Sequence, residues 1–539
     1  MLRAQVFAAW VLALTAGSSI AQEHQHSTAP EKLGTVRFAT SCKPAAQKQF
    51  DRGVALLHSF QFSRAINGFN TALKADASCA IAYWGIALSH WSNPFAPGLK
   101  VTSQLQDGWQ AAKRGQSLGA RTEREQAYIS AVSKLYADFE KTPEQTRLLA
   151  YRDAMAEVAL HYPQDHEASI FYALALAASE QPSDKTYAGR LKAGAILETL
   201  FAQEPEHPGL AHYIIHTYDV PPLAARALLA AQRYSVIAPD APHALHMPSH
   251  TFTRIGYWQD SIDSNLAAAT AARREGQTAE ELHALDYQVY AYLQTAQDDA
   301  ARRLVESLPE IVSRFNPGMV ISGAAPPSAG YFALAAIPAR YALERQDWKA
   351  AAMLEVRESP FPHAEAMTHF ARGLAAAHLG DVAGARSSRE ALANIHERLV
   401  KSKEGYWAEQ VEIQRRTVSA WTALAEGNRG AALQEMKSAA ELEDDTEKSA
   451  VSPGPLATSR ELLGEMLLQM NQPAEALEQF EAACKREPNR FRALYGAARA
   501  AHLKPDPEAS RRYSAELIIV CAHADKPGRK ELAEVALSE

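Results

Sequence analysis

The chain has 539 residues, of which 47% are hydrophobic and 22% are charged, and its formal net charge at pH 7 is −7. On average domain size, this length would suggest several domains, but the repeats favour one continuous array. Such mild acidity gives no indication of binding to nucleic acid or to a membrane surface, both of which favour clustered lysine and arginine. We therefore expect no nucleic-acid partner and no membrane insertion.

Residues 1–21 have the features of a secretory signal peptide. Arg3 precedes the apolar run VFAAWVLALTAG, which is too short to span a membrane, and small residues stand at Ser19 and Ala21. This arrangement predicts cleavage after Ala21, which would leave a mature chain of formal charge −8 because Arg3 is lost. We expect a periplasmic or secreted protein that begins with a disordered polar tail at residues 22–40.

The four cysteines form two pairs near the two ends of the chain, and the members of each pair are 37 residues apart. An even number of cysteines suits an oxidising compartment. We expect the disulfides Cys42–Cys79 and Cys484–Cys521. The alternative is four small, buried side chains without a bridge.

Two segments at opposite ends of the chain share one pattern of small and aromatic residues. The pattern consists of Gly53, Ala65, Phe69 and Ala72 in the first segment, and of Gly464, Ala476, Phe480, Ala483 and Pro488 in the second. Small residues let two antiparallel helices approach closely, phenylalanine fills the gap between neighbouring hairpins, and proline ends the second helix. Both segments resemble the tetratricopeptide repeat (TPR).

Looser copies of this pattern extend the resemblance over most of the mature chain. The stretches LLHSF, CAIAYWGIALSHW and HALHMPSHTFTRIGYW are similar to those of an uncharacterised subgroup of bacterial exported TPR proteins. The resemblance implies an all-α, right-handed TPR-like solenoid of about 10–12 helical hairpins, whose first helices line a concave groove. We expect arrays at 41–314 and 331–539, a Pro/Gly-rich hinge or insertion at 315–330, and a surface loop at 89–108.

Two histidine pairs stand one repeat length apart. His212 and His216 are four residues apart, as are His246 and His250, and the offset between the pairs is 34 residues. Residues four apart share one face of a helix, and 34 residues is the length of a TPR. Since Pro205 and Pro239 close successive repeats, 208–219 and 242–253 are expected to be successive first helices. We therefore expect a two-by-two patch of imidazoles.

Further polar residues extend this patch. His243 and Asp219 fall on the same helix faces as the pairs, and His283 and Tyr287 follow His246 and His250 by 37 residues each. Pro248 is expected to kink its helix and turn two histidines toward a common centre. By resemblance to TPR domains, all of these residues would line the concave groove. We predict metal ligands at His212, His216, Asp219, His243, His246 and His250, and groove residues at His283 and Tyr287.

Several histidines with one carboxylate suit Zn or Cu, and less readily Fe with open coordination positions. An imidazole-lined site for an organic or peptide ligand, and a purely structural cluster, are the alternatives. No glutamate base stands between the paired histidines, and there is no phosphate-binding glycine loop and no G-x-S-x-G turn. We predict an exported TPR scaffold that binds a peptide or protein and carries a metal site. A metal-dependent hydrolase or oxidase, or a copper- or zinc-handling protein, is the alternative.

Overall fold

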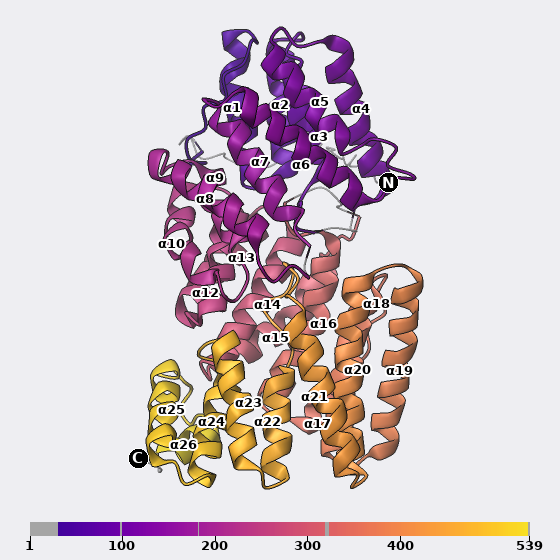
Figure 1. The fold of residues 1–539 in the computed structure, drawn as a ribbon, viewed down its shortest axis with the longest axis vertical. Coiled ribbons are helices and arrows are strands. Elements are labelled where there is room, and N and C mark those ends of the chain that lie inside the picture. Colours follow the sequence, from indigo (N-terminus) through magenta and orange to yellow (C-terminus); the bar gives the residue numbers. More distant parts are fainter. Residues whose placement is uncertain (1–30, 97–99, 182, 319–322, 537–539) are drawn as a thin grey trace, which may run out of the picture.

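The computed structural model describes residues 31–96, 100–181, 183–318 and 323–536. These residues form helices and connecting loops without any strand, and consecutive helices pair antiparallel, from α1 with α2 to α24 with α25. The predicted all-α, TPR-like solenoid is thus confirmed (Figure 1). The predicted signal peptide and residues 22–30 lie outside the described residues.

The helices fall into three consecutive groups. The N-terminal group, at the top of Figure 1, comprises α1 (Pro44–His58), α2 (Phe62–Ala75), α3 (Ile81–Trp91), α4 (Thr102–Leu118), α5 (Glu123–Lys134), α6 (Glu144–His161), α7 (His166–Ala178) and α8 (Ala188–Gln203). The central group comprises α9 (Pro208–Thr217), the 3-10 helix η1 (Ala224–Ala227), α10 (Leu228–Ile237), α11 (Pro242–His246), α12 (Pro248–Ile255), α13 (Trp258–Arg274), α14 (Thr278–Gln294) and α15 (Asp298–Ser313).

The C-terminal group follows the predicted insertion. It comprises α16 (Pro327–Glu344), α17 (Trp348–Ala352), α18 (Pro362–His378), α19 (Val382–Lys401), α20 (Gly405–Ala425), α21 (Arg429–Asp445), α22 (Ser459–Gln469), α23 (Pro473–Arg486), α24 (Phe491–Leu503), α25 (Pro507–Val520) and α26 (Lys530–Ala536). In the part that the structure describes, none of the helices is long and apolar enough to cross a membrane.

The repeat pattern packs as the sequence predicts. The ring of Phe480 lies between α22 and α24, where a Cβ added to Gly464 would come within 2.7 Å of it. Phe69 occupies the equivalent place at the other end of the chain, against Gly53 and Gly85. Close helix approach at glycine, with an aromatic ring filling the gap, therefore fixes the hairpin geometry at both ends.

Three sequence expectations differ from the structure. Residues 31–40, expected to be disordered, run extended against the helices because Leu33 and Phe38 are buried, and the Phe38 ring lies 5.2 Å from that of Phe50. The expected loop at 89–108 ends early, since α4 already begins at Thr102. The kink expected at Pro248 within 242–253 is a full break, because Pro248 lacks a backbone donor, and it separates α11 from α12.

Only one of the two predicted disulfides is present among the described residues. Cys42 and Cys79 are bridged and tie the start of α1 to the start of α3. The predicted bridge Cys484–Cys521 is wrong, because both thiols are free. Cys521 instead directs its Sγ toward the carbonyl oxygen of Gln294, at 3.9 Å. Equal spacing in sequence therefore does not bring the second pair together.

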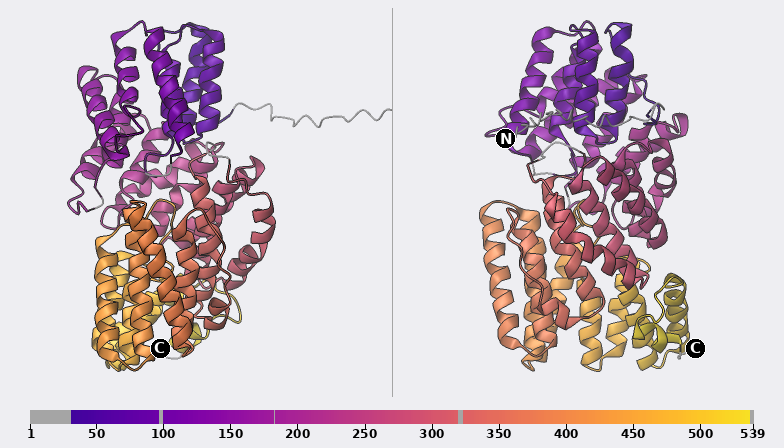
Figure 2. Two further views of the ribbon diagram at one scale, coloured as in Figure 1. Left: turned by 90° about the vertical axis from the view of Figure 1, so that its right-hand side faces the viewer. Right: turned by 180° about the vertical axis from the view of Figure 1, so that it is seen from behind.

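The C-terminal hairpins fold back onto the central repeats (Figures 1 and 2). The Trp258 indole donates to the carbonyl oxygen of Asn489 at 2.7 Å, and the Phe491 amide donates to the Gln294 side chain at 2.9 Å. Gly256, at a φ of +70°, admits this approach, since a Cβ there would lie 2.4 Å from the Pro488 oxygen. The inner face of the central first helices is therefore enclosed by the chain's own C-terminal half.

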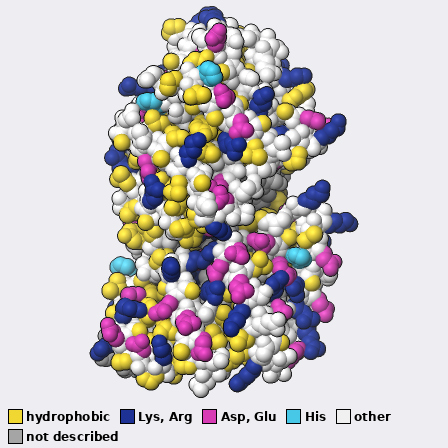
Figure 3. All heavy atoms as spheres, viewed as in Figure 1, with side chains coloured by type: hydrophobic (Ala, Val, Ile, Leu, Met, Phe, Trp, Pro, Cys, Tyr) yellow, Lys and Arg dark blue, Asp and Glu magenta, His cyan; other side chains and the backbone are white. Residues whose placement is uncertain are grey.

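Acidic and basic side chains intermingle on the face of the molecule drawn in Figure 3. Few histidines are visible on that face. The paired histidines His212, His216, His246 and His250 are buried instead.

Candidate metal centre

Two sets of three buried histidines lie side by side where the central first helices meet. The first trio is His212 and His216 of α9 with His243 of α11, and the second trio is His246 of α11 and His250 of α12 with His283 of α14. Within each trio, one ring nitrogen from every histidine lies within 4.8 Å of the others. No member is more than 5% exposed.

This grouping differs from the expected two-by-two patch. The structure brings all four paired histidines together, and the His216 and His250 rings are 5.9 Å apart. Each pair, however, is completed by a histidine from the first helix of the following repeat. His243, one turn before His246, joins the preceding pair, and His283 joins the following one.

Hydrogen bonds fix the protonation of two rings in the second trio. Nδ1 of His246 lies 2.7 Å from Oδ1 of Asn265, whose amide group donates to the Ser261 carbonyl oxygen and so must present its oxygen to the ring. Nδ1 of His250 lies 2.9 Å from a carboxylate oxygen of Asp219. Both Nδ1 atoms therefore carry hydrogen. Their Nε2 atoms, which carry lone pairs, face each other at 3.1 Å.

Asp219 lies behind His250 and does not face the centre as a ligand, contrary to the prediction. One of its oxygens accepts from Arg254 at 2.9 Å, and the other accepts from His250 and Lys448, each at 2.9 Å. Burial opposes its ionisation, yet Lys448 and Arg254 hold the pKa of Asp219 well below its usual value. The carboxylate is therefore charged and orients the His250 ring.

The first trio presents nitrogens without hydrogen-bond partners among the described residues. Nδ1 of His212 donates to the carbonyl oxygen of His58 at 2.6 Å, which leaves the lone pair on Nε2. That Nε2, the Nε2 of His216 and both nitrogens of His243 have no hydrogen-bond partner within the described part of the chain, although Nδ1 of His243 lies 3.9 Å from a carboxylate oxygen of Glu280. Phe95 stacks on His216 with ring centres 4.3 Å apart and walls this trio from one side.

Burial keeps these imidazoles neutral. It lowers the pKa of His212 and of His283 to about 3, and neighbouring imidazoles add to the effect. The pKa values of His216, His243 and His246 are lowered well below the usual value, and that of His250 is also lowered, again with burial as the main cause. Neutral imidazole is the form of histidine that binds metal ions.

The predicted groove residues are buried rather than open to a ligand. His283 is 5% exposed and Tyr287 is fully buried, and the loop 446–458 between α21 and α22 covers them. The Tyr287 hydroxyl donates to the carbonyl oxygen of Ser452 in this loop at 3.1 Å. Its ring lies 4.8 Å from that of His246. The inner face at these positions is therefore filled by the chain itself.

A small cavity of about 20 Å³ joins the two trios. Its walls include His216 and His243 of the first trio and His250 and His283 of the second. Three connecting segments close it: the loop after α3 with Asn93 and Ala96, the segment before α16 with Ala324, Ala325 and Pro326, and the loop 446–458 with Ala450 and Val451. The two stretches that interrupt the repeats in the sequence thus converge on the histidines.

A third group, His58 with Glu167 and His207, serves as a contrast. Each histidine donates from Nε2 to Glu167, at 2.9 and 3.0 Å. The Nδ1 of His58 lies 3.0 Å from the Tyr213 hydroxyl, and that of His207 accepts from the Leu210 amide at 3.3 Å. Every ring nitrogen is used, so this group forms a complete hydrogen-bond network without an ion.

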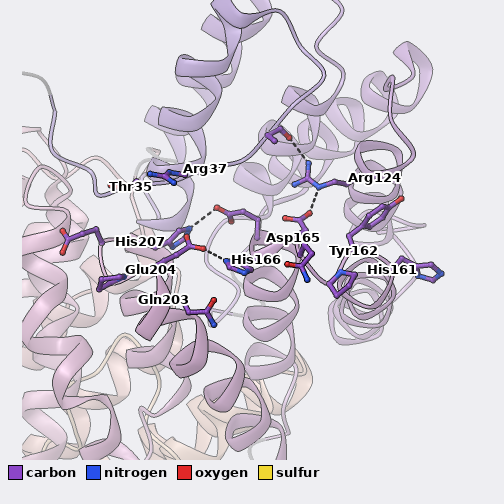
Figure 4. Close-up of a pocket in the computed structure, with 16 residues that line it drawn as sticks. Thr35, Arg37, Arg124, His161, Tyr162, Asp165, His166, Gln203, Glu204 and His207 are labelled. Atoms are coloured by element: carbon purple, nitrogen blue, oxygen red, sulfur yellow. Dashed lines mark hydrogen bonds and ion pairs between the residues drawn. The ribbon is translucent and has the colours of Figure 1, made fainter.

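A larger cavity of about 880 Å³ lies next to His207 (Figure 4). Among its charged groups, Arg124 pairs with Asp165 at 2.5 Å and His166 pairs with Glu204 within the wall. Among the described residues that line this cavity, we find no set of histidine nitrogens that converge as they do in the two trios.

Comparisons with known proteins bear on the fold alone. No family model and no curated protein matches the sequence. Among solved structures, the human IFIT1 dimer with m7Gppp-AAAA is 9% identical, covers 87% of this chain and 95% of its own, and has a TM-score of 0.35. The APC/C hetero-tetramer Cut9–Hcn1 is 12% identical, with 93% and 77% covered and a TM-score of 0.34. Yeast Tom70 is 10% identical, with 92% and 95% covered and a TM-score of 0.28. Similarity at this level carries no argument about function.

The repeat pattern of the sequence did not indicate several residues that contact the histidines. Asn265 lies on α13, a second helix, and Lys448 and Ser452 come from a loop more than 150 residues beyond the histidines. A signal for the loop was present, because SAVSPGP at 449–455 breaks the helical pattern between two repeats.

Proposed function

We propose that this protein is a metalloprotein, a TPR-like scaffold that encloses a transition-metal centre with His246, His250 and His283 as ligands of one ion. The observation that carries the proposal is the pair of facing Nε2 lone pairs at 3.1 Å. Two lone pairs at this separation repel each other unless a cation lies between them.

The geometry supports a metal ion as that cation. Two nitrogens bound about 2.1 Å from one ion lie about 3.0 to 3.4 Å apart for bond angles between a right angle and the tetrahedral angle. The observed 3.1 Å falls in this range. A proton in its place would put an imidazolium next to the buried cations Lys448 and Arg254, which share Asp219 with His250.

The donor set favours copper or zinc. Neutral imidazoles suit Cu and Zn, and also Fe when coordination positions remain open. Behind the ligands, Asn265 and Asp219 accept from the outer nitrogens, which is how metal-binding histidines are commonly oriented. Three protein ligands leave a coordination position free, and the adjoining cavity supports a metal-dependent enzyme as a candidate activity.

The proposed protein also binds a peptide or protein partner and is exported. A peptide or protein partner would bind away from the histidines, because the loop 446–458 fills the inner face there. Export to an oxidising compartment is supported by the disulfide Cys42–Cys79.

Metal retention tests the proposal. The full chain, stripped with chelator, reloaded with Zn(II) or Cu(II) and desalted, is expected to retain stoichiometric metal in elemental analysis. The variant His246→Asn/His250→Asn is expected to retain at least one equivalent less, because the facing nitrogens are gone. The variant His161→Asn/His523→Asn, which replaces two exposed histidines, is the matched control and is expected to retain as much metal as the wild type. Equal retention by wild type and the His246/His250 variant would refute the assignment.

A further inference from the structure

The first trio shows the features of a second, separate ligand set. His212, His216 and His243 are 0%, 4% and 3% exposed, and they carry four nitrogens without hydrogen-bond partners among the described residues. An unsatisfied buried polar group destabilises a fold. Three such side chains converging within 4.8 Å are therefore unfavourable unless something binds between them.

The third group, His58 with Glu167 and His207, shows that buried histidines in this fold can have all of their ring nitrogens hydrogen-bonded. His58 and His207 are as deeply buried, yet all of their nitrogens are used by Glu167, Tyr213 and the Leu210 amide. Among the described residues, single ring nitrogens of His90, His363 and His378 also lack hydrogen bonds, but these histidines are isolated, whereas the nitrogens of the first trio converge. In the first trio the fold provides an outward hydrogen bond only for His212, through the carbonyl oxygen of His58, and the buried carboxylate of Glu280 lies 3.9 Å from Nδ1 of His243.

The two trios open into the same space. The cavity of about 20 Å³ has histidines of both trios in its walls, and apart from Asn93 its remaining walls are alanine, proline and valine side chains. A cavity of this size holds about one water molecule. No carboxylate lines it, so two divalent ions held by neutral imidazoles would leave it strongly positive.

We propose that the six histidines hold two metal ions, one in each trio, which share a single water-sized anionic ligand such as hydroxide in the cavity between them. This inference rests on the proposed metal centre and adds the second ion and the ligand class. Pairs of ions close enough to share one oxygen ligand are a recurrent arrangement in metalloenzymes. The space between the described walls, about 20 Å³, fits a ligand of this size.

Copper loading with electron paramagnetic resonance (EPR) tests the inference. The full chain is expected to retain two Cu(II) ions whose EPR signal accounts for only a small part of the copper, because ions that share a bridging ligand couple magnetically. The variant His212→Gln/His216→Gln is expected to retain one Cu(II) with its full signal. The variant Ala329→Val, which places a larger side chain in the cavity wall, is expected to keep both ions and recover the signal.

Ala333→Val provides the matched control for the cavity variant, because Ala333 is buried on the same helix but does not line the cavity. The wild-type measurement decides the question even if a variant fails to fold. One Cu(II) per chain, lost only with the His246/His250 variant, would overturn the second ion and leave the proposed function intact. Two Cu(II) with full EPR intensity would overturn the shared ligand. No retained metal would refute the proposed function itself.

Discussion

Replacing Asp219 with alanine is expected to lower the free energy of unfolding by about 3–5 kcal/mol. The substitution leaves Lys448 and Arg254 as buried cations without their shared counterion, and the His250 Nδ1 loses its acceptor. Their side chains are only 6% and 4% exposed, so water does not replace the carboxylate. Denaturant unfolding followed by circular dichroism measures the change.

Asp445→Ala is the matched control for this prediction. Asp445 is an exposed aspartate at the end of α21, and its loss is expected to change stability by no more than about 0.5 kcal/mol. If Asp219→Ala proved as mild as this control, Asp219 would not be the counterion that joins the loop 446–458 to the centre.

Replacing Arg340 with methionine is expected to destabilise the fold by a similar amount, about 3–5 kcal/mol. Arg340 and Asp286 are 2% and 0% exposed and pair at 2.8 Å between α16 and α14. The same guanidinium donates to the carbonyl oxygens of Gly454 and Pro455, each at 2.8 Å. Its loss leaves a buried carboxylate unpaired and releases the loop that covers the histidines.

Hydrogen exchange and a double variant separate these two consequences. Amides in the loop 446–458 are expected to lose protection in Arg340→Met, while Arg345→Met, at a half-buried position at the C-terminal end of α16, leaves them unchanged. Adding Asp286→Asn is expected to recover part of the stability, because no unpaired charge remains. A double variant less stable than Arg340→Met would contradict the role given to this ion pair.

The repeat architecture and the gathering of the histidines follow from sequence. Gly464 with Phe480, and Gly53 with Phe69, pack as their spacing predicts, because helix approach is a local property of one hairpin and its neighbour. The 34-residue offset between His212 and His246 likewise places them on adjacent first helices. Periodicity carries this information because every repeat contacts mainly the next one.

The closed inner face could not be predicted from the sequence, because it depends on contacts between distant repeats. Lys448 reaches Asp219 across 229 residues, and Tyr287 contacts Ser452 across 165, because the C-terminal half folds back over the central repeats. No repeat period encodes that closure, so an open groove was expected where the structure is filled. The regrouping into trios depends on the break at Pro248, and the absent Cys484–Cys521 bridge depends on side-chain direction.

The proposed metal ion lies between the Nε2 atoms of His246 and His250. Crystals of the copper- or zinc-loaded protein, measured on both sides of the metal's absorption edge, test it most directly. We predict an anomalous difference peak about 2.1 Å from both Nε2 atoms and within bonding distance of His283. A loaded crystal with no peak at this position, and with the two rings still facing each other, would contradict the account.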